Sequence, residues 1–277
     1  MKRDLVPLKL LFRWAYGEKL IGHKLNFDKI PTPSARRPHF EDDEWDELIK
    51  KSDDWIKLVQ GKHKRHVRSR TYLKHYIHIL GYTGIRPGTE VQSITWRSIK
   101  KKVLSNKSKT AYIVHISKGK TGPRTIILNA ELNDHIDALK QFRKKELSKA
   151  GKSFNRDEAV FCNFDGTPTH SFKGGFATFL KKYNLQNNFA GKKRVPYSLR
   201  HTFATRMIGY STNHWDLAKY MGTSVALLEK NYVHNNRETI GSKFFDPDPN
   251  KGQVLRLEEE SVDDVLQGLF NQPNIEL

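Results

Sequence analysis

The sequence is poor in cysteine, in acidic residues and in long apolar runs. Cys162 is the only cysteine among 277 residues, which excludes disulfide bonds within the chain and cysteine metal clusters. No apolar run approaches the roughly 20 residues that a membrane helix needs, so no membrane span is predicted. The start of the chain carries early positive charge, but Lys9 interrupts its apolar part and no small-residue cleavage site follows. A signal peptide is therefore not predicted either.

Positive charge, by contrast, is abundant. Lys and Arg number 49 against 30 Asp and Glu, which gives a net charge of +19. Such an excess implies an anionic polymer as partner, either nucleic acid or an acidic membrane surface. A cytoplasmic, nucleoid-associated location fits this composition. The histidines form no His-Glu-x-x-His pattern, and His75 and His78 are interpreted as part of a solvated helix face rather than as metal ligands.

Composition divides the chain into four stretches. Residues 1–22 contain one predicted helix, and residues 23–39 form a basic linker with several prolines. Residues 40–245 are predicted to be the main domain. Residues 246–277 form a tail that contains few apolar residues at first and more of them from Val262 onward. Because one helix cannot bury its own apolar face, the first stretch is either the remnant of a larger domain or a helix that docks elsewhere.

The tail is predicted to contain an amphipathic helix. Ser261 and the acidic residues after it resemble a capped helix start. An apolar stripe at helical spacing follows, made of Val262, Val265, Leu266, Leu269 and Phe270. This helix either folds back on its own domain or docks on a neighbouring protomer, and the neighbour is favoured because Pro247 and Pro249 separate the helix from the domain.

The main domain is predicted to be α+β, mainly helical with a small antiparallel β-sheet. Apolar residues recur at helical spacing in residues 42–52, 130–149 and 171–184. The period changes to strict alternation in residues 111–116 and 124–128, which predicts two strands. The connection between these strands is a basic hairpin tip that contains Lys118 and Lys120.

A basic run lies ahead of the sheet. It lies at the start of a predicted helix and contains no acidic residue. Its positive residues are Lys62, Lys64, Arg65, Arg68 and Arg70. Such a run is either a solvated helix start or a set of phosphate contacts. Together with Lys118 and Arg124 of the hairpin, these residues are the predicted DNA-binding side chains.

Four reactive residue types occur in an informative order. Arg86 lies in Thr-Gly-Ile-Arg-Pro-Gly-Thr-Glu, which ends on Glu90, and Arg200 lies in Ser-Leu-Arg-His-Thr-Phe-Ala. Lys120 lies between the two arginines, and Tyr232 follows them. Together these pieces resemble the tyrosine recombinase family, also called phage integrases, over roughly residues 40–243. The resemblance implies the family's catalytic-domain fold, preceded here by an incomplete core-binding domain.

The resemblance assigns a role to each matched residue. Arg86 and Arg200 match the two family arginines, Tyr232 matches the nucleophile, and Glu90 matches an acid that braces the first arginine. Lys120 matches the family lysine, for which Lys118 is the weaker candidate. His201 follows Arg200 and is predicted to support the site.

Two positions depart from the family pattern. The histidine that precedes Leu-Arg in the family is Tyr197 here, and the later histidine or tryptophan is Thr223, nine residues before Tyr232. The spacing is kept, so both look like substitutions in a retained frame. Each hydroxyl could still donate a hydrogen bond to a phosphate oxygen, whereas a tyrosine is a poor general base.

The matched residues suit attack on a phosphodiester. Two guanidiniums can hold the non-bridging oxygens and stabilise the transition-state charge. Tyr232 would then attack phosphorus to form a 3′-phosphotyrosyl link, and Lys120 would protonate the departing 5′ oxygen. No metal or cofactor is predicted.

The resemblance thus predicts a site-specific integrase that cleaves and rejoins double-stranded DNA as a homo-tetramer, with a free chain that could be monomeric. Two alternatives remain at this stage. One is a DNA-binding relative that has lost the chemistry, and the other is an enzyme like the type IB topoisomerases.

Overall fold

The computed structural model describes residues 2–27, 38–59, 61, 63–103, 110–210 and 212–232. The chain divides into two compact units, Met1–Arg36 and Arg37–Leu277. The predicted tail helix with Val262, Val265, Leu266, Leu269 and Phe270 lies outside the described residues, as does Lys62. No helix in the described part of the chain is long and apolar enough to cross a membrane.

The first unit consists of one helix and the segment that follows it. Helix α1 (Lys2–Gly17) is the helix predicted within residues 1–22. The chain then turns, and the ring of Phe27 lies 5.7 Å from that of Phe12. Three apolar side chains of the helix, Leu10, Leu11 and Trp14, are each more than half exposed within this unit. The unit therefore has very little core of its own.

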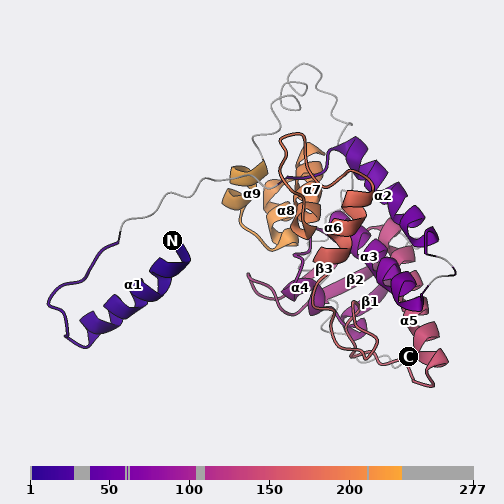
Figure 1. Cartoon of the computed structure of the whole chain (residues 1–277), viewed down its shortest axis with the longest axis horizontal. Coiled ribbons are helices and arrows are strands. Elements are labelled where there is room, and N and C mark those ends of the chain that lie inside the picture. The colour runs from indigo at the N-terminus through magenta and orange to yellow at the C-terminus, as the bar shows by residue number, and fades with distance from the viewer. Residues whose placement is uncertain are drawn as a thin grey trace, which may run out of the picture. The chain divides into compact units, whose positions relative to one another are not determined.

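The second unit is mainly helical (Figure 1). Its helices are α2 (Asp42–Lys57), α3 (Lys64–Thr83), α4 (Thr89–Gln92), α5 (Ala130–Lys149), α6 (Lys173–Lys182), α7 (Pro196–Gly209), α8 (His214–Met221) and α9 (Val225–Tyr232). Helix α5 has the predicted bounds. Helix α2 runs further than predicted because Trp55, in its last turn, is also buried.

Three strands form a small antiparallel sheet. Strands β1 (Ile99–Val103), β2 (Thr110–Ile116) and β3 (Arg124–Ile127) lie in the order β1-β2-β3. Val114 is opposite Ile99 on one side and Ile126 on the other, and all three are buried. The two predicted strands are therefore confirmed as β2 and β3, and β1 precedes them. Burial does not alternate along β2, because Ala111, Tyr112, Ile113 and Val114 are all buried.

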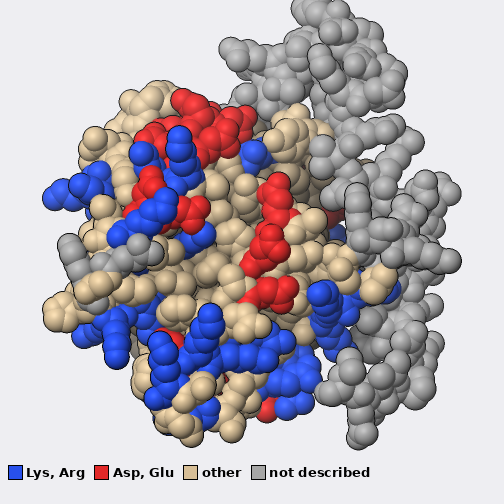
Figure 2. All heavy atoms as spheres, turned by 90° about the vertical axis from the view of Figure 1, so that its right-hand side faces the viewer, with Lys and Arg blue, Asp and Glu red and all other residues tan. Residues whose placement is uncertain are grey.

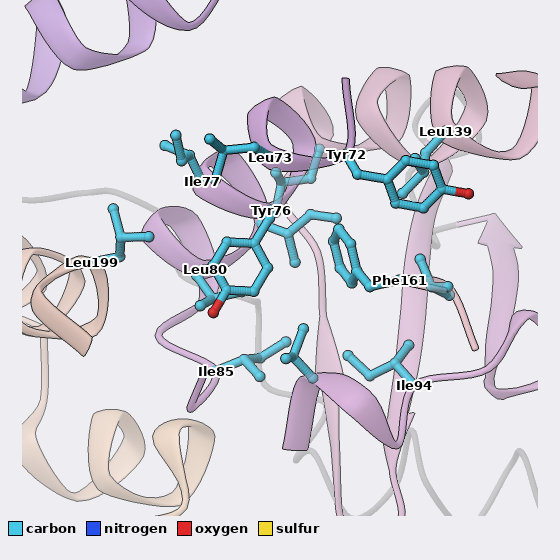
Figure 3. Packing of buried hydrophobic residues seen from close by; sticks show 14 of the residues in the cluster. Tyr72, Leu73, Tyr76, Ile77, Leu80, Ile85, Ile94, Leu139, Phe161 and Leu199 are labelled. Atoms are coloured by element: carbon cyan, nitrogen blue, oxygen red, sulfur yellow. The ribbon is translucent and has the colours of Figure 1, made fainter. Parts of the chain in front are cut away.

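Helix α3 is the centre of the unit. It packs against α2, α5, α6 and α7, so side chains on almost every side of its second half are buried. Tyr76 and Phe161 meet edge to face in this core, and Leu80 and Ile85 lie beside them (Figure 3). A second, smaller core joins α7, α8 and α9 through Phe203, Met221, Leu228 and Tyr232, among others. The predicted α+β class, mainly helical with a small antiparallel sheet, is confirmed.

Candidate active site

Two left-handed glycines bring two helix ends together. Gly84 ends α3 with φ +63°, and Gly222 ends α8 with φ +63°. A Cβ at Gly84 would lie 2.5 Å from the ring of Phe203, and a Cβ at Gly222 would lie 2.9 Å from a guanidinium nitrogen of Arg124. Neither position has room for a side chain. The last carbonyls of both helices lack intrahelical donors. Those at the ends of α3 and α8 both face the guanidinium of Arg200.

Arg200 extends from α7 between these two helix ends. Its Nη1 donates to the carbonyl oxygens of Gly84, at 2.5 Å, and Met221, at 2.9 Å. The residue is only 2% exposed. Within the described part of the chain, no carboxylate pairs with this guanidinium. Arg200 is therefore a buried cation whose partners are neutral.

Arg86 lies in the turn that follows α3. Its backbone N–H and its Nη1 both donate to the carboxylate of Glu90, at 2.9 and 2.5 Å. Its Nη2 donates to the Gly222 carbonyl at 2.5 Å. The α8 end thus receives a donor from each of the two family arginines, so the orientation of both depends on where α8 stops.

Glu90 is shared between two arginines. Besides Arg86, it accepts from Arg124 Nη2 at 2.8 Å, while Arg124 Nε donates to the Tyr220 carbonyl at 3.0 Å. Burial alone would raise the pKa of Glu90, but the hydrogen bonds from Arg124 and Arg86 outweigh it and hold the pKa below its usual value. The carboxylate of Glu90 is hydrogen-bonded to Arg86 and Arg124, and it also acts electrostatically on Arg200.

The electrostatics of Arg200 show how near these groups are. Burial, followed by repulsion from Arg86, lowers the pKa of Arg200 to about 10, and the phenols of Tyr197 and Tyr232 act in the opposite direction together with Glu90. Arg200 remains protonated at neutral pH. The structure thus places Arg86, Tyr197 and Tyr232 close enough to Arg200 to change its pKa.

Three rings connect α7 to α9. The ring of His201 lies 5.2 Å from that of Tyr197 and 5.2 Å from that of Tyr232. Tyr232, in the last turn of α9, is 7% exposed. An imidazole lies next to the predicted nucleophile, although it comes from His201 and not from the position that Tyr197 occupies.

The lysine hairpin reaches the same helix end. Lys118 and Lys120 are both exposed. Between them and strand β3, Thr121 Oγ1 donates to the Gly222 carbonyl at 3.1 Å, which is the carbonyl that Arg86 also uses. Thr223 follows directly and is half-buried, with its backbone N–H donating to the Ala218 carbonyl at 2.9 Å. The sequence offers no signal for Thr121, because a threonine in a basic turn has no distinguishing pattern.

The predicted DNA-binding residues separate into two groups. Arg68 pairs with Glu146 at 2.6 Å, Arg70 donates to the Trp55 carbonyl at 2.7 Å, and Arg124 pairs with Glu90. These guanidiniums already have protein partners, and Arg124 in particular is a brace within the site. The exposed predicted contacts in the described part of the chain are Lys64, Arg65 and Lys118.

The interpretation of His75 and His78 as a solvated face is wrong. Each is 6% exposed, because α2 and α5 pack on this side of α3. His75 Nδ1 lies 3.0 Å from Nδ1 of His135, and the ring of His78 stacks on that of His135 at 3.9 Å. Burial lowers the pKa of His75 to about 3 and that of His78 to about 2. In the described residues, no group of three or more His, Cys, Asp or Glu side chains is placed to hold a metal ion.

An open cleft of about 320 Å³ borders the site. Pro87 and Gly88, next to Arg86, line it together with Tyr197 at the start of α7 and Lys173 at the start of α6. Tyr197 thus lines this cleft and is also an electrostatic neighbour of Arg200.

Solved structures with this architecture are recombinases. A Tn1549 transposon integrase in complex with transposon right end DNA matches with a TM-score of 0.61 at 20% identity, over 88% of this chain and 78% of that one. XerH recombinase bound to difH matches with a TM-score of 0.60 at 17% identity, over 88% and 65%. A lambda integrase dimer bound to a core site matches with a TM-score of 0.54 at 16% identity, over 83% and 58%. The present chain thus spans less than two thirds of the matched XerH and lambda integrase chains.

The sequence also matches the phage integrase family over residues 40–239. No curated protein matches the chain. The chain belongs to the phage integrase family, which confirms the family, the catalytic-domain fold and the site-specific recombinase function predicted from the sequence.

Proposed function

We propose that the chain cleaves and rejoins double-stranded DNA through a covalent link between Tyr232 and a 3′ phosphate. The observation that carries the proposal is Arg200, a buried guanidinium with neutral partners that lies beside a second arginine. A buried charge is costly unless an opposite charge compensates it. A DNA phosphate supplies that charge, and its non-bridging oxygens suit the paired donors of a guanidinium.

The chemical step follows from this placement. Arg86 and Arg200 hold the non-bridging oxygens and stabilise the added negative charge as phosphorus becomes five-coordinate. The Tyr232 phenol loses its proton to water and its oxygen forms a bond to phosphorus. The bond from phosphorus to the 5′ oxygen breaks, and Lys120 gives that oxygen a proton. Attack by a 5′ hydroxyl of a second strand reverses the step and releases Tyr232. Glu90 and Arg124 keep Arg86 in place throughout.

The roles of Tyr197, His201 and Thr223 are part of the same proposal. Tyr197 and Thr223 donate hydrogen bonds to phosphate oxygens, in place of the family's imidazole and indole groups. His201, in ring contact with Tyr232, orients the phenol. Replacing Tyr197 with histidine tests this arrangement, because a rise of tenfold or more in cleavage rate indicates that the phenol is a handicap, whereas a fall indicates a role of its own.

The partners and domains are proposed with it. Residues 40–245 serve as the catalytic domain, and residues 1–22 contribute the final helix of a core-binding domain. Lys64, Arg65 and Lys118 contact phosphates. The matched Tn1549, XerH and lambda structures are each described as bound to DNA. A homo-tetramer on two DNA sites fits an exchange of strands between duplexes.

A nicked duplex that loses a short strand after cleavage tests the proposal. The wild-type chain should remain bound to the DNA in denaturing electrophoresis, and the Tyr232→Phe variant should not, because the phenol oxygen is absent. If the wild-type chain binds the duplex but is never trapped, the chain is a DNA-binding relative without the chemistry. Relaxation of supercoiled DNA without any exchange between two duplexes would instead indicate a topoisomerase.

A further inference from the structure

One long stretch of the second unit contains no acidic residue. Between Asp165 and Asp216 the sequence has neither Asp nor Glu. The stretch holds α6, α7 and the loop between them, and its Lys and Arg residues are Lys173, Lys181, Lys182, Lys192, Lys193, Arg194, Arg200 and Arg206. Other parts of the surface carry charges of both signs, and the face in Figure 2 shows both acidic and basic side chains.

The loop between α6 and α7 contains a tight hairpin, residues 187–193. Asn187 and Lys193 form an antiparallel bridge. Asn188 donates its N–H to the Lys192 carbonyl at 3.0 Å, and its side-chain oxygen accepts from the Lys192 N–H at 2.9 Å. Gly191, with φ +69°, closes the turn by donating to the Asn188 carbonyl at 2.9 Å. The turn is thus held by its own hydrogen bonds.

A buried arginine anchors the base of this hairpin. Arg194 is 2% exposed and donates to the carbonyls of Leu185, Asn187 and His39 at 3.1, 2.9 and 2.9 Å. Its Nη2 also pairs with Glu44 of α2. These bonds tie the base of the hairpin to the start of α2 and to the segment that follows α6.

The tip carries Phe189, which is 93% exposed. Among the other exposed large apolar side chains of this unit, the most exposed are Val103 and Trp215 at 62% each. Phe189 therefore contributes almost nothing to the core, and almost the whole of its ring is open to a partner. Lys192 and Lys193, both exposed, lie on the returning arm.

We propose that residues 187–193 form a DNA-binding element in which Phe189 stacks on a base or wedges between base steps while Lys192 and Lys193 contact the flanking phosphates. Apolar wedges with basic neighbours are a known way to bind and kink duplex DNA. The inference rests on the proposed function for its partner, DNA, but not for any step of cleavage.

The hairpin is within reach of the DNA around the site. Lys193 precedes Tyr197 by four residues, which span at most about 14 Å of extended chain. Phe189 precedes Tyr197 by eight residues, or about 27 Å at most. At roughly 3.4 Å per base pair, 27 Å corresponds to about eight base pairs, so the chain length keeps the tip near the DNA that the proposed site would hold. Charge favours DNA over a second copy of the chain, since each copy carries +19.

The test uses the Tyr232→Phe chain, so that binding is measured without cleavage. Its affinity for a short mixed-sequence duplex is compared with that of the same chain carrying Phe189→Ala. We expect the loss of the ring to weaken binding about tenfold or more, and Phe189→Trp to restore it, because stacking tolerates any aromatic ring. Val103→Ala, which shortens another exposed apolar side chain of the same unit, is the control and should leave affinity unchanged.

Two further measurements separate the ring from the lysines. 2-Aminopurine placed at successive positions of the duplex should brighten at one or two positions on binding, and only when Phe189 is present. Replacing Lys192 and Lys193 with Gln should reduce the slope of log affinity against log salt by about 2, whereas Phe189→Ala should leave it unchanged. Thermal unfolding should be the same for all variants.

Equal affinity and equal fluorescence with and without the ring would overturn the proposal. A change in oligomeric state on Phe189→Ala in the absence of DNA would also overturn it, in favour of a contact between protein copies. A chain that binds DNA through Phe189 but is never trapped on a nicked duplex would leave this inference standing while the proposed cleavage fails.

Discussion

Two buried arginines of this protein have opposite surroundings. Arg143 on α5 is 0% exposed, and its Nε and Nη2 donate to both oxygens of Glu158 at 3.0 Å each, while Nη1 donates to Glu146 at 3.2 Å. Arg200 is 2% exposed, and its guanidinium donates to two backbone carbonyls in the described part of the chain. One cation is therefore neutralised inside the protein, and the other is not.

The protonation equilibria of the two arginines differ accordingly. Burial acts to lower the pKa of Arg143, but the carboxylates of Glu158 and Glu146 raise it above the ordinary value. Burial lowers the pKa of Arg200 as well, and there Arg86 adds to the effect. Arg143 is thus neutralised by carboxylates of the folded chain, whereas the proposed function assigns to Arg200 an anion that comes from outside.

Replacing Arg143 should have the largest effect on stability. Arg143→Ala leaves Glu158 and Glu146 without their shared partner, and breaking such a buried pair typically costs about 3–5 kcal/mol. Urea denaturation measures the loss. The double variant Arg143→Met, Glu158→Met removes the charge on both sides and should recover much of it; if it is no more stable than the single variant, ion pairing is not what holds this region.

Replacing Arg200 should mainly affect cleavage. Arg200→Ala should reduce the rate of covalent trapping by roughly 10²–10³, the usual effect of losing one preorganised donor to the transition state. Its unfolding free energy should fall by less than that of Arg143→Ala, because a costly uncompensated charge leaves with the side chain. Equal losses of stability for the two variants would remove the distinction between them.

Thr121 should have a smaller effect on cleavage than Arg200, because it supports the end of α8 and holds no phosphate itself. Thr121→Val removes one hydrogen bond to the Gly222 carbonyl, worth about 0.5–1.5 kcal/mol, so trapping should slow about threefold to tenfold. Thr121→Ser should restore the rate. Thr121 holds the hairpin that carries Lys120, and Lys120 is proposed to protonate the 5′ oxygen. With a substrate whose leaving group needs no proton, Thr121→Val should therefore no longer slow trapping. Persistence of the effect would place Thr121 elsewhere in the mechanism.

The histidines between α2, α3 and α5 predict a smaller, pH-dependent effect. His75 and His78 have pKa values lowered to about 3 and about 2 in the folded chain, mainly by burial. As pH falls through the ordinary pKa near 6.5, the unfolded chain binds protons that the folded chain does not, so stability falls. Each histidine should cost about 0.7 kcal/mol between pH 7 and pH 6. His78→Asn, which retains a polar group near Ser52, should flatten this dependence in urea denaturation; an unchanged slope would contradict it.

Much of the fold was accessible from sequence patterns, because local spacing reports local structure. The helical period of residues 130–149 matches α5, and the alternation in residues 111–116 matches β2. The order of Arg86, Lys120, Arg200 and Tyr232 indicated which residues to bring together. The burial of His75 and His78 was not accessible, since the period of α3 does not reveal that neighbours cover nearly all of its sides.

The amino-acid sequence alone established the residue types and their order, namely two arginines with a lysine hairpin between them and a tyrosine that follows. Only the tertiary structure decided which arginine receives carboxylates and which receives carbonyls. The physical reason is that a guanidinium's charge is the same in every sequence context, and its compensation depends on groups brought near by packing. Arg143 and Arg200 are the same residue type, and they differ only in the groups that the fold places around them.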